Sequence, residues 1–105
     1  MVLLNPRNPE HILIPAELLD TIPRLYATEK IEDPLAVIKL FTPDSNWCWY
    51  VTEYDPEECM AFGLVVGLDS ELGYFSIQEL EELRGPLSLP VERDLHFKPD
   101  RKSVV

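Results

Sequence analysis

Acidic side chains offer most of the chemistry in this sequence. Asp and Glu number 19 against 9 Lys and Arg, and six of the acidic residues gather at two expected turns. They are Glu53, Asp55, Glu57 and Glu58 at the first turn, and Asp69 and Glu71 at the next. Carboxylate oxygens are the ligands that hard divalent cations prefer, so a cation site at residues 53–58 is one interpretation. The favoured interpretation is a solvated hairpin tip, and an EF-hand is excluded because its loop needs a central glycine.

The overall charge restricts the classes of partner. The formal net charge is −10, which argues against a basic nucleic-acid-binding surface and against docking on anionic lipid, because both need clustered Lys and Arg. An alternative function is a mobile-element decoy that imitates the charge spacing of DNA phosphates and binds a DNA-binding protein. The further carboxylates in that hypothesis are Glu79, Glu81, Glu82, Glu92 and Asp94.

Histidine and cysteine are the other reactive side chains. The sequence has two of each, His11 and His96, and Cys48 and Cys59. A thiolate nucleophile needs a nearby base, and Cys48 and His96 fall on one expected sheet face, so a dyad is one hypothesis. The favoured interpretation is a solvated His96 and two free thiols. The expected register places the two cysteines too far apart for a disulfide, which needs Cα atoms within about 7 Å.

Familiar catalytic motifs are absent from the sequence. It contains no phosphate-cradling glycine loop, no His-Glu-x-x-His, no Cys-x-x-Cys and no Gly-x-Ser-x-Gly, which are patterns that mark nucleotide, metal and nucleophile sites. We therefore assign no catalytic, cofactor-binding or metal-ligating residue and expect no cofactor. A non-enzymatic protein is favoured. The alternative of a small enzyme or divalent-metal binder would use Glu53, Asp55, Glu92, Asp94 or His96.

Two helices are expected from hydrophobic periodicity and capping signals. The first runs over about 15–22, because Pro23 would clash with the helix backbone. The second begins with a capping box between Ser76 and Glu79. A glycine and a proline at 85–86 end it, as is typical of a helix C-terminus.

The strands complete an α+β fold of a single domain. They are expected at 36–42, 47–54, 62–66, 72–75 and 91–98, from β-branched and apolar content and alternation. The element order is α-β-β-β-β-α-β, a mostly antiparallel sheet of about five strands with two helices on one face. We expect an N-terminal arm at 1–11, the domain at 12–99 and a frayed tail at 100–105.

The turns between the strands predict which residues pair. The expected pairs are Leu40–Trp49 and Ile38–Val51 across the turn at 43–46, and Val51–Phe62 and Trp49–Leu64 across the turn at 55–58. Successive side chains of a strand point to opposite faces. The expected core face therefore carries Ile38, Leu40, Trp47, Trp49, Val51, Phe62, Leu64, Val66 and Phe75.

The opposite face is aromatic, and little chain is left to cover it. Its candidate interaction residues are Lys39, Phe41, Tyr50, Tyr54, Tyr74 and His96. An aromatic patch with a polar rim is typical of protein interfaces, so we expect a protein partner or a homodimer contact here. Stacking of single-stranded nucleic acid on these rings is disfavoured, because only Lys39 and Lys98 add positive charge nearby.

No segment has the pattern of a membrane span or a signal peptide. The longest apolar runs, such as 62–66, are far shorter than the roughly 18 residues that a span needs. The N-terminus has no basic region followed by an apolar stretch. With only two cysteines, the chain is expected in the reducing cytoplasm.

Five stretches of the sequence also resemble a known family. They are 25–29 (LYATE), 41–47 (FTPDSNW) with Trp49 and Tyr50, 62–67 (FGLVVG), 71–76 (ELGYFS) and 89–94 (LPVERD). Together they resemble the domain of unknown function 2958 family, which consists of short bacterial proteins often encoded on plasmids and other mobile elements. The resemblance spans roughly residues 12–99, and Cys48 and His96 depart from the family pattern. It implies no catalytic residue, and the mobile-element setting implies an accessory role such as plasmid maintenance or counter-defence.

Overall fold

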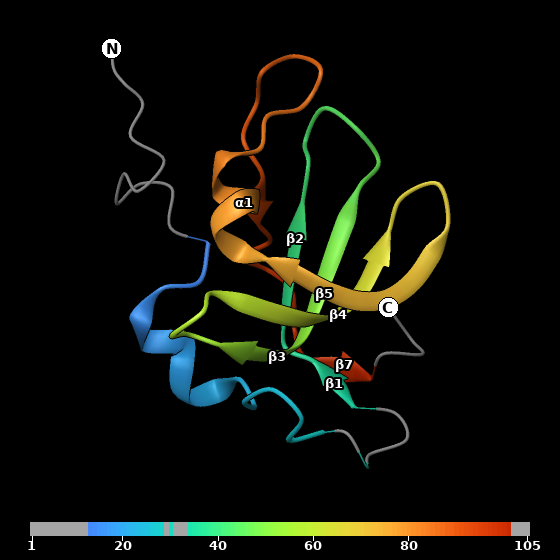
Figure 1. Ribbon diagram of the computed structural model, residues 1–105. Helices are drawn as coiled ribbons and strands as arrows, with labels where there is room; N and C mark the ends of the chain where they lie inside the picture. The colour runs from blue at the N-terminus through green and yellow to red at the C-terminus, as the bar shows by residue number, and fades with distance from the viewer. Residues whose placement is uncertain (1–12, 29, 31–33, 102–105) are drawn as a thin grey trace.

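The main sheet has five antiparallel strands in the order β5-β4-β3-β2-β6 (Figure 1). The computed structural model describes residues 13–28, 30 and 34–101, so the expected arm at 1–11 lies outside the described residues. The strands are β2 (Ile38–Phe41), β3 (Cys48–Asp55), β4 (Met60–Val66), β5 (Ser70–Ser76) and β6 (Glu92–Arg93). A smaller sheet pairs β1 (Leu35–Ala36) with β7 (Asp100–Arg101).

Helix is a minor part of the described chain. It comprises the 3-10 helix η2 (Ala16–Thr21) and the α-helix α1 (Ile77–Glu82). The fold is therefore mainly β with some helix. The element order differs from the expected α-β-β-β-β-α-β, because β1 and β7 form an additional small sheet.

The first helix is a 3-10 helix and not the expected α-helix over 15–22. Its hydrogen bonds join an amide to the carbonyl three residues earlier, as between the Leu18 amide and the Pro15 carbonyl (3.0 Å). Ile22 is extended, with φ −109° and ψ 124°, because the ring of the following Pro23 disfavours the α conformation in the residue before it. A segment this short has too few hydrogen bonds to offset the cost of nucleating an α-helix.

The start of α1 confirms the predicted helix cap. Ser76 Oγ accepts a hydrogen bond from the Glu79 amide (3.1 Å). The helix ends at Glu82, before the expected stop at 85–86, because Leu83 is already extended. The chain then turns back on itself through a β-bridge between Arg84 and Pro90.

The first hairpin has the predicted register, and the second does not. Ile38 pairs with Val51, as expected. In the second hairpin Val51 pairs with Gly63 and not with Phe62, because the turn closes between Asp55 and Met60 and the register then shifts between Val51 and Glu53. Such a β-bulge adds one extra residue to β3. A prediction based on strict alternation of side chains along the strand does not include this extra residue.

The bulge reverses the two faces of β4. Ala61 and Val65 pack with the core, whereas Phe62, Leu64 and Val66, which were expected in the core, lie on the opposite face. Tyr54 moves the other way, into the core, and is only 5% exposed. Gly63 fits this crowded point, since a Cβ there would lie 1.8 Å from the Tyr50 carbonyl oxygen.

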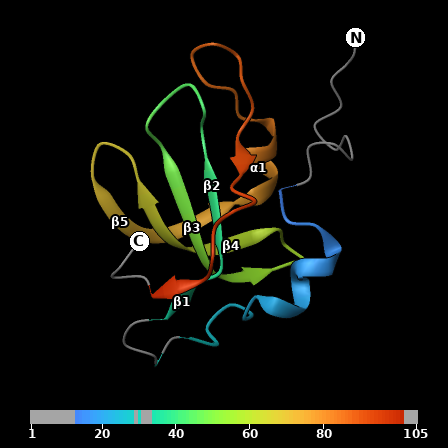
Figure 2. The same ribbon diagram turned by 180° about the vertical axis from the view of Figure 1, so that it is seen from behind.

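The C-terminal part also differs from its prediction. The strand expected over 91–98 is only two residues long, because Asp94 begins a turn. Its carboxylate accepts a hydrogen bond from the His96 amide (2.9 Å), and its carbonyl accepts one from the Phe97 amide (3.3 Å). Aspartate favours such turns by binding the backbone two residues on. The tail expected to fray at 100–105 starts with β7, which lies beside β1 (Figure 2).

The core lies between one face of the sheet and the two helical segments. Its buried members are Leu13, Ile14, Ile22, Ile38, Leu40, Trp49, Val51, Tyr54, Ala61, Ile77, Leu80 and Val91. They come from both ends of the described chain and from the strands between them. The core side of the sheet is thus covered, whereas the other face is covered only in part, by the 26–28 segment at Glu53 and by Phe97 at Tyr50.

Candidate interaction surfaces

Glu53, expected in an exposed acidic patch, is a buried structural carboxylate. It is 4% exposed and accepts hydrogen bonds from the amides of Tyr26 (2.8 Å) and Thr28 (2.9 Å), as well as from the Thr28 hydroxyl. A carboxylate can be buried when several donors replace its water. Glu53 therefore holds the 26–28 segment against the sheet and belongs to no surface site.

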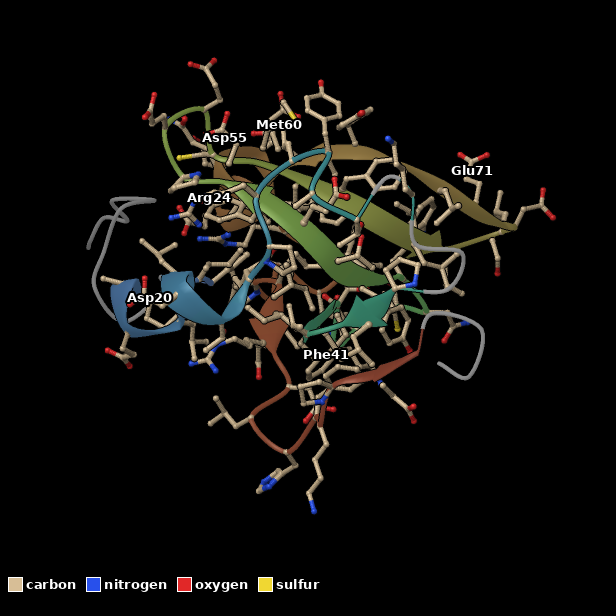
Figure 3. All side chains as sticks on the ribbon, turned by 90° about the horizontal axis from the view of Figure 1, so that it is seen from below. Asp20, Arg24, Phe41, Asp55, Met60 and Glu71 are labelled. Carbon is tan, nitrogen blue, oxygen red and sulfur yellow. The ribbon has the colours of Figure 1, made fainter. Side chains whose placement is uncertain are left out.

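The other predicted acidic residues lie at two separate turns. Asp55 accepts a hydrogen bond from the Glu57 amide (3.0 Å) in the β3–β4 turn, whereas Asp69 and Glu71 lie in or just after the β4–β5 turn. Figure 3 shows Asp55 and Glu71 at opposite ends of the sheet. Over the described residues no group of three or more His, Cys, Asp or Glu side chains is placed to hold a metal ion.

The thiols and His96 lie on different elements: Cys48 on β3, Cys59 in the β3–β4 turn and His96 in the turn after β6. Cys48 and Cys59 are both free and half-buried, as predicted. Cys48 lies within the sheet between Phe41 and Val66. His96 is exposed in the turn after β6, where its backbone amide bonds to the preceding aspartate.

The face of the sheet away from the core, which we call the outer face, consists of four rows of cross-strand neighbours. The rows are Glu92–Phe41–Cys48–Val66–Ser70, Lys39–Tyr50–Leu64–Leu72, Glu53–Phe62–Tyr74 and Asp55–Met60–Ser76. Residues that pair directly across strands have their side chains on one face, close enough to touch. The outer face is thus apolar and aromatic in its middle, with charged residues at the β2–β6 side and at the Glu53–Asp55 end of β3.

The predicted interaction residues divide between the outer face and other places. Lys39, Phe41, Tyr50 and Tyr74 lie on the outer face. The Tyr50 ring is partly covered by Phe97 (5.9 Å between centroids), and Lys39 Nζ lies 5.8 Å from the Tyr50 centroid. Tyr54 was expected here and lies in the core, because the bulge reverses its direction. His96 lies beyond the sheet in the 94–97 turn.

The most exposed part of the outer face lies over β4 and β5. We call it the β4–β5 surface, and its members are Phe62, Leu64, Leu72 and Tyr74 with Tyr26 beside them. Tyr74 is 55% exposed and Leu72 is 48% exposed. The Tyr74 ring packs on Phe62 (4.8 Å between centroids) and on Tyr26 (6.5 Å). These contacts fix the rings in place, while Tyr26 and Tyr74 remain more than half exposed.

Comparison with known proteins identifies the family. A family model described as Protein of unknown function (DUF2958) matches residues 13–104. The chain belongs to this family. The match includes every residue of the outer face and confirms the resemblance seen in the sequence. No curated protein and no solved structure matches this DUF2958 chain.

This DUF2958 chain has a second apolar area, at the end where three connections meet. The β2–β3, β4–β5 and α1–β6 connections project from the same end of the molecule (Figure 1 and Figure 2). Its exposed side chains, which we call the loop-end surface, are Trp47, Leu68, Leu83, Leu87 and Leu89. A groove of about 410 Å³ lies between the β2–β3 and α1–β6 connections, lined by Trp47 and Trp49, whose rings stack at 6.1 Å, and by Arg84 and Pro86.

The loop-end surface was missed by sequence reasoning, which placed Trp47 in the core. The Trp47 ring instead lies over Gly67, where an added Cβ would be 2.5 Å from the ring. Asp44 Oδ2 accepts hydrogen bonds from the amides of Leu87 (2.8 Å) and Leu89 (3.3 Å) and so joins two of the connections. These contacts join residues far apart in sequence, so no local pattern signals them.

The structure also bears on membrane insertion. Among the residues it describes in this DUF2958 chain, no helix is long and apolar enough to cross a membrane.

Proposed function

We propose that this DUF2958 member is a non-enzymatic protein-interaction module that binds a protein partner through the β4–β5 surface. The observation that carries the proposal is the exposed Tyr74–Leu72 pair on a paired strand, backed by Phe62 and Tyr26. Aromatic side chains at the centre of an apolar patch supply much of the binding energy of protein interfaces. We place the interaction in the bacterial cytoplasm, with an accessory role on a mobile element, as the family resemblance suggests.

The β4–β5 surface is favoured over the loop-end surface for two physical reasons. Its side chains stand on neighbouring, hydrogen-bonded strands, so little conformational entropy is lost when a partner orders them. It also centres on tyrosine, whereas the loop-end surface is mostly leucine, a residue type that is under-represented among interface hot spots.

The decoy alternative has less support. Two of the carboxylates that it would need, Glu53 and Glu81, are buried, and the Leu13 amide donates to Glu81 Oε2 (3.2 Å). A third, Asp69, lies at the far end of the sheet from Asp55. A DNA mimic needs regularly spaced surface charge to match a DNA-binding protein, and these carboxylates do not supply it.

Affinity capture with matched variants tests the proposed function. Tagged wild-type protein and the Tyr74→Glu, Leu72→Glu and Leu87→Glu variants are incubated with extract of the native cell, and retained proteins are identified by mass spectrometry. We expect one partner to be retained by wild type and Leu87→Glu and lost from both β4–β5 variants. Thermal denaturation shows whether each variant is folded. A partner lost from Leu87→Glu and retained by folded Tyr74→Glu would move the site to the loop end.

A further inference from the structure

β5 is an edge strand of the main sheet. β5 is the first strand in the sheet order, and within residues 13–28, 30 and 34–101 no strand pairs with its outer side. The strand has seven residues, Ser70–Ser76, without a proline. Its one charged residue is Glu71. Natural edge strands are commonly shortened, bulged or protected by lysine or proline, because open edges recruit other strands, and β5 shows none of these devices.

The side chains of β5 suit an added strand on both faces. On the outer face, Leu72 and Tyr74 are two residues apart, and the alternate side chains of a new strand would pack against them. On the other face, an added Cβ at Gly73 would meet no atom within 4 Å. A large apolar side chain opposite Gly73 therefore finds open space, as aromatic residues do beside edge glycines.

The charges near the two ends of β5 determine which kind of added strand is attracted to it. Asp69 and Glu71 lie at its start, and Ser76 at its end pairs with Met60, directly after the turn that carries Glu57 and Glu58. A strand with Lys or Arg at both ends therefore meets opposite charge at both ends.

The same charges disfavour a second copy of the chain. Antiparallel pairing of two β5 strands about Gly73 would bring the 69–71 end of one copy next to the 57–58 turn of the other. Acidic groups would then face acidic groups at both ends, between two chains that each carry a net charge of −10. Like charges that face each other across an interface weaken it.

We propose, on the basis of the proposed function, that the partner adds an extended segment to the edge of β5. The segment has apolar residues against Leu72 and Tyr74, a large apolar residue opposite Gly73 and basic residues at both ends. Its backbone pairs with β5, which gives affinity, and its side chains give specificity. This β-strand addition extends the five-stranded sheet to a sixth strand.

Two labelled peptides test the edge directly. The probe is KRTVFVTRK, and its matched control is EDTVFVTDE, which keeps the same apolar centre. We measure binding to the full chain by fluorescence anisotropy and map amide hydrogen exchange with and without peptide. We expect the basic peptide to bind about tenfold more tightly than the acidic one at low salt, less so at high salt, and to slow exchange at residues 70–76.

Two charge variants separate local from general electrostatics. Glu71→Lys lies on β5, whereas Glu17→Lys makes the same charge change on the exposed side of η2. Glu71→Lys is expected to weaken the basic peptide several-fold more than Glu17→Lys does. Equal effects of the two variants, equal binding of the two peptides, or slowed exchange at the loop end instead of 70–76 would overturn the proposal. Exchange at 70–76 that slows with protein concentration alone would assign the edge to a second copy and also overturn it.

The edge proposal and the proposed function can fail separately. If the captured partner depends on Tyr74 while residues 70–76 exchange at the same rate with and without it, the partner binds the surface without adding a strand. The edge proposal is then wrong and the proposed function stands. If capture does not depend on Tyr74, the proposed function is wrong.

Discussion

At the residue scale, the most informative side chain is Glu53. Its position at the end of an acidic stretch suggested an exposed hairpin tip. It is instead buried, because the β-bulge turns it toward the amides of Tyr26 and Thr28. Tyr26 has a positive φ of 70°, a conformation that is uncommon for a residue with a side chain. The carboxylate therefore holds a local backbone conformation that the sequence of the 26–28 segment does not favour.

Removal of the Glu53 carboxylate should destabilise the fold. Glu53→Ala leaves the part-buried Tyr26 amide, the buried Thr28 amide and the Thr28 hydroxyl without their acceptor, at a cost of about 3 kcal/mol in the free energy of unfolding. The control is Glu57→Ala, an exposed residue four positions from the buried carboxylate in the next turn, for which a change within about 0.5 kcal/mol is expected. Urea denaturation measures both. Equal stability of the two variants would mean that the Glu53 hydrogen bonds contribute little.

At the element scale, local signals predicted some features and long-range packing determined others. The first hairpin and the helix cap at Ser76 were predictable, because the turn at 43–46 and the capping box are local patterns. The bulge after Val51 was not, since any one residue of β3 could have been the extra one. The small β1–β7 sheet joins residues more than sixty apart in the chain, so no turn signal relates its two strands.

The two paired glycines of β4 and β5 provide a matched test of the bulge. Gly63 and Gly73 lie opposite each other, yet an added Cβ would lie 1.8 Å from the Tyr50 carbonyl oxygen at Gly63 and near nothing at Gly73. Gly63→Ala should lower the free energy of unfolding by about 1–3 kcal/mol. Gly73→Ala should leave it unchanged or raise it by about 0.5 kcal/mol. Thermal or urea denaturation measures the stability of both variants. If both were as stable as wild type, the bulge geometry would be contradicted.

The Asp44 contact should control the order of the loop-end surface. Asp44→Ala removes the acceptor for the Leu87 and Leu89 amides, at a cost of about 1 kcal/mol. Hydrogen exchange at these two amides should become faster. Asp69→Ala, in the exposed β4–β5 turn, is the control and should leave both amides unchanged. Unchanged exchange in Asp44→Ala would show that the loops are held by other contacts, such as Trp47 on Gly67.

At the scale of the whole molecule, the charge and the apolar surfaces have separate roles. The carboxylates behind the net charge of −10 are of two kinds. Buried carboxylates hold segments in place, and exposed carboxylates lie at the turns. The sequence predicted an aromatic face with Phe41, Tyr50 and Tyr74, and these residues do share the outer face. It could not predict that Phe62 and Leu64 join them or that Tyr54 leaves, because both follow from the one-residue shift at the bulge. The candidate site was therefore predictable as a face and not as a set of residues.

The most direct test of the central claim is a titration of the purified partner against Tyr74→Glu and Leu87→Glu. If the β4–β5 surface is the binding site, Tyr74→Glu weakens binding by about thirtyfold, as loss of an interface hot spot does. Leu87→Glu, at the loop end and 73% exposed, then changes the affinity less than about twofold, as substitutions outside an interface hot spot do. Unchanged affinity of folded Tyr74→Glu, with loss of binding by Leu87→Glu, would contradict the account.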